Sequence, residues 1–177
     1  FSVGAVALKK NFFSRRIGLG AAGEAVPIVA GGRLSGKAGK YNVGLLNMQT
    51  SEVGDTLPGN NFSVVRIARD LPNRSSVGAL FVNRSATGNL AGSDNNNQTF
   101  AVDGRLGVRQ NTVVSRFLAK TRTPETSGAE EDLLAFNLRS STNLRKIDVD
   151  AGYQQVGDQF NPEVGFLSRR GYRKPDV

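Results

Sequence analysis

Acidic side chains next to each other, or two residues apart, are the first candidates for chemistry in this sequence. Asp148 and Asp150 would place neighbouring carboxylates on one strand face, as a glycosidase acid pair requires. Such a pair also needs one raised pKa, and charges opposite Arg or Lys explain it more simply. The run Glu130-Glu131-Asp132 could offer oxygens to a divalent cation, but no EF-hand spacing or further ligand set accompanies it. We therefore predict no catalytic residue, no cofactor and no metal site.

Two basic clusters and one glycine motif are the remaining candidates. Arg15-Arg16 and the run 169–174 could hold phosphate, lipopolysaccharide headgroups or nucleic acid, although solubilising charge is the simpler interpretation. No aromatic stacking platform or recognisable module accompanies them, so we predict no nucleic-acid partner. Residues 18–23 fit G-x-G-x-x-G, but Pro27 and a strand pattern follow where a dinucleotide site needs a helix. We interpret them as a glycine-rich turn.

The composition narrows the function classes further. The 177 residues carry 23 Lys and Arg against 15 Asp and Glu, a formal charge of +8, and contain neither Cys nor His. Without them there is no disulfide, no thiolate and no Ser-His pair. No run of about 18 apolar residues exists, which excludes a transmembrane helix but not strands that cross a bilayer. The chain starts at Phe1 without a signal peptide pattern, so we expect a mature product or an excised segment.

The elements that must position any site follow a period of two. In residues 99–108, Phe100, Val102, Leu106 and Val108 alternate with polar or small residues. Residues 133–140 and 144–155 alternate in the same way. Side chains of a strand point to opposite faces in turn, and no segment carries a helical stripe. The sequence therefore predicts an all-β protein.

Eight strands are predicted, joined by connections that alternate in length. The strands lie near 25–36, 41–50, 62–70, 76–84, 98–109, 112–121, 132–140 and 144–156, with further extended pieces expected at 1–8 and 12–19. Short connections fall at 37–40, 71–75, 110–111 and 141–143, and long polar ones at 51–61, 85–97, 122–131 and 157–162. This layout is typical of an antiparallel up-and-down meander and of outer-membrane barrels.

We predict one barrel-type domain, or a segment of one, spanning residues 1–177. It divides into an N-terminal extended region at 1–24, a meander of four hairpins at 25–156, and a loop with a basic C-terminal segment at 157–177.

The two faces of the predicted strands differ in polarity. One side is apolar, and the polar side contains the residues that we expect to face a barrel lumen. These are Arg33, Asp103, Arg105, Asn137, Arg139, Lys146, Asp148 and Asp150. A closed barrel satisfies every backbone donor and acceptor in lipid, whereas a soluble barrel or sandwich with one solvated face would alternate as well. The membrane interpretation is favoured, although the absence of Trp and the presence of only 3 Tyr leave Phe to form any aromatic girdle.

Several stretches resemble, in order, one bacterial family. They include Arg69-Asp70-Leu71-Pro72-Asn73-Arg74-Ser75 and Phe160-Asn161-Pro162-Glu163-Val164-Gly165-Phe166, with further ones at 12–19, 26–28, 33–37, 41–47 and 81–84. Together they are similar to the C-terminal region of the family called domain of unknown function 5916. The resemblance implies an envelope protein with an N-terminal carbohydrate-binding-module-9-like sandwich and a C-terminal outer-membrane-type barrel, and it carries over no catalytic residue. The sandwich is missing here, and so is a final strand ending in an aromatic residue.

These observations predict a non-enzymatic outer-membrane barrel, or a segment of a larger one, that is structural or transport-related and could serve glycan handling. Its expected partners are outer-membrane lipid, glycan or other envelope proteins, and further strands of the same protein or a neighbouring subunit that cover open edges. The alternative is a soluble or surface β-sheet module that recognises glycan or protein through its long loops. For a segment, the strand at 25–36 should not pair with the strand at 144–156.

Overall fold

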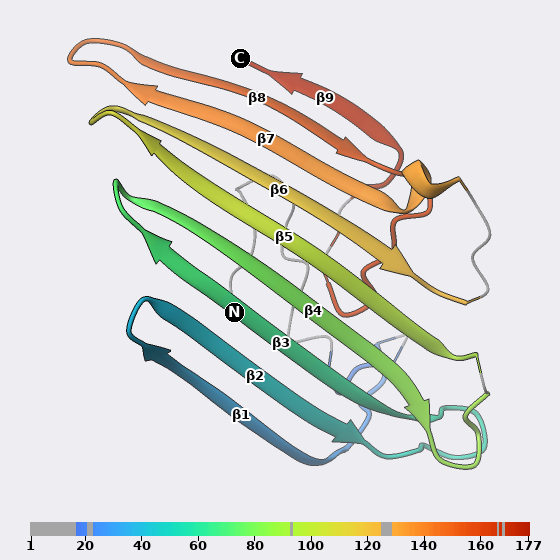
Figure 1. The fold of residues 1–177 in the computed structure, drawn as a ribbon. Helices are drawn as coiled ribbons and strands as arrows, with labels where there is room; N and C mark the ends of the chain where they lie inside the picture. Colours follow the sequence, from blue (N-terminus) through green and yellow to red (C-terminus); the bar gives the residue numbers. More distant parts are fainter. Residues whose placement is uncertain (1–16, 21–22, 93, 125–128, 166, 168) are drawn as a thin grey trace.

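The described part of the chain forms one antiparallel β-sheet (Figure 1). The computed structural model describes residues 17–20, 23–92, 94–124, 129–165, 167 and 169–177. Within them, nine strands follow one another in sheet order, and a short 3-10 helix, Glu130–Leu133, precedes β7. The strands are β1 (Ile28–Ala38), β2 (Tyr41–Thr50), β3 (Gly59–Leu71), β4 (Ser75–Thr87), β5 (Asn96–Val108), β6 (Thr112–Arg122), β7 (Leu134–Asn143), β8 (Asp148–Val156) and β9 (Tyr172–Asp176).

The predicted alternation of short and long connections is confirmed. Short turns join β1 to β2, β3 to β4, β5 to β6 and β7 to β8, all at one end of the strands, which we call the turn edge (Figure 1). The longer connections lie at the opposite end, the loop edge. At the β3–β4 turn, Asn73 and Arg74 adopt φ of 56° and 57°, the left-handed pair that a tight hairpin turn requires.

Two features of the strand prediction are corrected. The sheet has nine strands rather than eight, because Tyr172–Asp176 pairs with β8 although residues 157–177 were predicted as loop and basic segment. Strand β8 begins at Asp148, since residues 144–147 form a turn closed by the Leu144 N–H on the Ile147 carbonyl at 2.9 Å. Most of the predicted N-terminal extended region lies outside the described residues.

The sheet is not closed into a barrel. Over the described residues, β1 pairs with β2 alone and β9 with β8 alone. The prediction that the strand at 25–36 does not pair with the strand at 144–156 is therefore confirmed. No helix among the described residues is long and apolar enough to span a bilayer.

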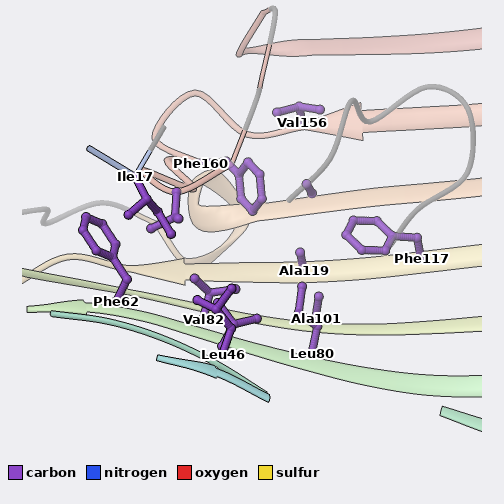
Figure 2. Close-up of a cluster of buried hydrophobic side chains, with 13 residues drawn as sticks. Ile17, Leu46, Phe62, Leu80, Val82, Ala101, Phe117, Ala119, Val156 and Phe160 are labelled. Carbon is purple, nitrogen blue, oxygen red and sulfur yellow. The ribbon is translucent and has the colours of Figure 1, made fainter. Parts of the chain in front are cut away.

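The buried core lies on one side of the sheet. Figure 2 shows Phe160, from the connection after β8, lying over the strands near Ile17 and Phe62. Small side chains such as Ala101 and Ala119 form the floor beneath this cluster. The β8–β9 connection thus folds back across the sheet, and the opposite side keeps no such cover from the described chain.

Candidate functional site

The alternation of burial along the strands separates two faces of the sheet. On β3, Phe62 and Val64 are buried whereas Ile67, of opposite parity, is 48% exposed. Residues directly opposite each other on neighbouring strands share a face, so the register extends this assignment across the sheet. We call the side with the buried cluster the packed face and the other side the open face.

Large apolar side chains cover the open face. They are exposed and extend from β1 to β8, and we call them the apolar band. Its exposed members are Leu34, Tyr41, Leu45, Ile67, Leu71, Val77, Phe100, Val102, Leu106, Val108, Leu118, Leu138, Val149 and Tyr153.

The band is continuous because its members are paired across the strands. One row of direct partners runs Leu34, Leu45, Val65, Phe81 and Phe100 over five strands. The rings of the last two residues lie 4.9 Å apart. The next row towards the turn edge consists of Val43, Ile67, Ala79, Val102, Leu118 and Phe136. The first row continues to Lys120 on β6 and the second to Gln155 on β8. Before these ends the two adjacent rows contain no polar side chain, and they make a surface that water solvates poorly.

A polar row bounds the band on the side of the loop edge. Asn47, Ser63, Asn83 and Gln98 are direct partners on β2 to β5. The Asn47 amide donates to the Ser63 hydroxyl at 2.8 Å. The change from Val, Leu and Phe to Asn, Ser and Gln occurs within one row, so the margin of the band is sharp.

The height of the band is comparable with the thickness of a membrane. Phe100 and Val108 are eight residues apart on β5, or about 27 Å along the strand at about 3.4 Å per residue. At the strand tilt of about 40° found in membrane barrels this is about 21 Å of height, against about 25 Å for the lipid-facing belt of such barrels.

Charged residues interrupt the open face at few places. Arg69 lies near the turn edge, with its guanidinium 5.3 Å from the centre of the Tyr41 ring. Arg116, on β6, is exposed between Val114 and Leu118 and is the main break in the band. Lys120, at the loop side, pairs with Glu130 at 2.7 Å.

The packed face instead carries several ion pairs. Arg66 of β3 reaches across β4 to Asp103 of β5, with two hydrogen bonds of 2.6 and 3.0 Å. Both side chains are mostly buried, at 15% and 22% exposed. The pair passes over Gly78, where a Cβ atom would lie 2.8 Å from the Arg66 Nη2 atom. Glycine at this position therefore leaves the space that the bidentate pair occupies.

The β8–β9 connection is attached to the packed face by polar contacts. Glu163 accepts a hydrogen bond from Arg84 of β4, and Asn97 of β5 donates to the Asn161 carbonyl at 2.9 Å. Phe160 and Val164 are fully or almost fully buried between these contacts. We call residues 157–165 the inward segment. A cavity of about 400 Å³ separates part of it from β2 and β3.

The residues predicted to face a lumen mostly lie together on the packed face. By register, this face includes Arg33, Asp103, Arg105, Asn137, Arg139, Asp148 and Asp150. The structure joins Arg139 to Asp150 at 3.2 Å. Lys146 is the exception, because it lies in the β7–β8 turn, outside the strands, and belongs to neither face.

Sequence reasoning missed Arg66, Arg84 and Glu163. Arg66 stands in a strand with apolar residues on both faces, which obscured its side. Glu163 lies in a connection, where periodicity gives no signal.

The acidic run that was weighed as a source of oxygens for a divalent cation, Glu130-Glu131-Asp132, forms most of the 3-10 helix before β7. The Lys120 ammonium, bonded to the carboxylate of Glu130, lowers the pKa of that carboxyl group. Within the described residues, no group of three or more acidic side chains could hold a metal ion.

Comparison of the chain with protein-family models, with curated proteins and with solved structures finds no match.

Proposed function

We propose that the sheet is part of the wall of a bacterial outer-membrane β-barrel, with the open face towards lipid and the packed face towards the interior. Its role is structural or transport-related rather than enzymatic. The observation that carries this proposal is the apolar band, which lies on the face that the described chain leaves uncovered and ends sharply at a polar row.

The polarity of the two faces supports lipid as the occupant of the open face. Soluble monomers rarely expose contiguous apolar patches larger than a few hundred Å², whereas this band crosses eight strands. A protein partner would need an equally broad flat surface. Lipid hydrocarbon covers such a face without needing a complementary surface, and the height of the band is close to that of the lipid-facing belt of membrane barrels.

The packed face supports an interior that holds water and paired charge. The Arg66–Asp103 and Arg84–Glu163 pairs lie there, together with buried Thr99. Ion pairs with additional hydrogen bonds tolerate such partial burial. The inward segment narrows this interior at the loop edge, as expected of a barrel that restricts passage.

The unpaired strand edges require further chain in a membrane. An open edge leaves backbone N–H and C=O groups without partners, which lipid does not solvate. The outward edges of β1 and β9 are unpaired among the described residues. Additional strands, from the same protein or a neighbouring subunit, therefore complete the wall.

Tryptophan scanning tests the proposal directly, because the chain contains no native Trp. Three single variants on β5 compare positions of one strand: Val102→Trp in the band, Asn96→Trp at the loop margin, and Arg105→Trp on the packed face. After folding into vesicles with brominated acyl chains, strong quenching and blue-shifted emission are expected at position 102 alone.

Equal quenching at the three positions would contradict a two-sided wall. The wild-type chain should also require detergent and show heat-modifiable gel mobility. A monodisperse monomer without detergent would end the membrane proposal and favour a module that binds glycan or protein through its loops.

A further inference from the structure

The four short turns at the turn edge share one charge. Their connecting residues contain Lys40, Arg74, Arg109, Arg145 and Lys146 and no acidic residue. Every turn therefore contributes at least one cation. We call these five residues the basic rim; all five are exposed.

The loop edge has the opposite balance. Its connections carry Glu52, Asp55, Asp94, Glu130, Glu131, Asp132, Asp158 and Glu163, with Arg169 and Arg170 as the described cations. Among the connections that the structure describes, positive charge is therefore concentrated at the turn edge, next to the part of the apolar band that includes Val108.

The rim is ordered by the fold rather than dispersed over a flexible surface. The Arg74 guanidinium donates to the backbone carbonyls of Arg109 and Gln110 at 2.9 and 2.8 Å, which joins the second turn to the third. Arg109, Arg145, Lys146 and Lys40 form no ion pair within the described part of the chain. Their charges remain available to an external anion.

The β7–β8 turn combines this charge with apolar side chains. Arg145 and Lys146 form its tip, between Leu144 and Ile147, which are 49% and 62% exposed. The backbone of Leu144 and Ile147 closes the turn with hydrogen bonds of 2.9 and 3.3 Å. Apolar side chains beside a basic tip suit the boundary where acyl chains meet headgroups.

We propose that the basic rim binds the phosphates of anionic phospholipids and so places the turn edge in a leaflet that contains them. The inference rests on the proposed membrane function and adds the lipid class and the orientation. Two observations point to lipid rather than to a soluble anion: the rim adjoins the apolar band, and Tyr41 with Arg69 marks the same boundary on the open face.

The test compares two double variants of equal net charge. Arg145→Gln with Lys146→Gln removes two rim cations, and Arg122→Gln with Arg169→Gln removes two exposed cations at the loop edge. The full chain is partitioned into vesicles of phosphatidylcholine alone and of phosphatidylcholine with phosphatidylglycerol, at low and high salt.

The wild-type chain should prefer the anionic vesicles, and salt should weaken this preference. A membrane-adjacent cation contributes about fivefold to binding of an anionic surface, so the rim variant should lose about twentyfold to thirtyfold of the preference, and the loop-edge variant little.

The outcomes separate the two proposals. Insertion into both vesicle types without preference would overturn the rim inference and leave the membrane function standing, whereas failure to enter either would remove both. Equal loss in the two variants would assign the effect to net charge and overturn the rim. If inorganic phosphate released the chain from the anionic vesicles more strongly than chloride at the same ionic strength, the basic rim would be a site for a soluble anion and the lipid inference would be overturned.

Discussion

An arginine placed at different depths along β5 should destabilise the protein according to its distance from the membrane midplane. Val102, Leu106 and Gln98 share the open face of this strand. With a rise of about 3.4 Å per residue and a strand tilt of about 40°, their heights along the membrane normal are about 18, 8 and 29 Å above the level of Arg109. Val102 and Leu106 therefore lie about equally far from the middle of the band, on either side of it, and Gln98 lies in the polar row beyond the margin of the band.

The expected losses follow from these depths. Val102→Arg and Leu106→Arg should each lower the free energy of unfolding in phospholipid vesicles by about 2–4 kcal/mol, because both positions lie near the middle of the band, where a charge in lipid costs most. Gln98→Arg should change it by less than about 0.5 kcal/mol, as surface substitutions usually do. Val102 is already 52% exposed, so the same substitution in a water-solvated sheet should also be nearly neutral.

Denaturant titration of the vesicle-folded protein, followed by heat-modifiable gel mobility, measures all three variants. A flat series would refute the assignment of the open face to lipid. A largest loss at Gln98 would show that the polar row, rather than the band, is the covered surface.

Three further predictions concern single positions. Gly78→Ala should lower the free energy of unfolding by about 1 kcal/mol, because the added methyl group displaces the Arg66–Asp103 ion pair that crosses this glycine. The matched control is Gly36→Ala, where a Cβ atom meets no atom within 4 Å. Equal effects of the two substitutions would contradict the close contact at Gly78. Arg116→Leu should raise the free energy of unfolding in vesicles by about 1–3 kcal/mol, because it removes a charge from lipid. A lower free energy of unfolding for this variant would indicate that the open face contacts water. The Glu130 carboxyl group should titrate at a lower pH than an ordinary glutamate in a pH series followed by NMR, because Lys120 lowers its pKa. Its pairing therefore stabilises the protein at neutral pH, and this stabilisation is lost as the pH falls through the lowered pKa. Lys120→Gln should return the titration midpoint to the ordinary value, and an unchanged midpoint would exclude the pair.

The sequence was sufficient for the sheet but not for all its strands. Alternation predicted β5 closely because Phe100, Val102, Leu106 and Val108 mark one face of this strand. Strand β9 was missed because Tyr172-Arg173-Lys174-Pro175-Asp176 has no apolar alternation and contains a proline. Its place beside β8 depends on backbone pairing across a connection whose length the pattern does not encode.

The sequence predicted which face of the sheet the polar residues occupy, but it did not predict their ion-pair partners. The polar side of each strand follows from parity, which placed Asp103 and Asn137 together. The partner of Asp103 lies 37 residues away, and the Arg84–Glu163 pair spans 79 residues. Both depend on strand register, and the second also on a connection folding back over the sheet.

The strictly sequential strand order makes the sheet modular. Among the described residues, every strand pairs only with its neighbours in the chain, so each hairpin contributes its own short turn and its own section of both faces. Removing or duplicating one hairpin would leave the flanking strands antiparallel, with their turns still at the same edge. In the proposed barrel, duplication or loss of about 35 residues would therefore change the circumference in steps of two strands and make the interior wider or narrower.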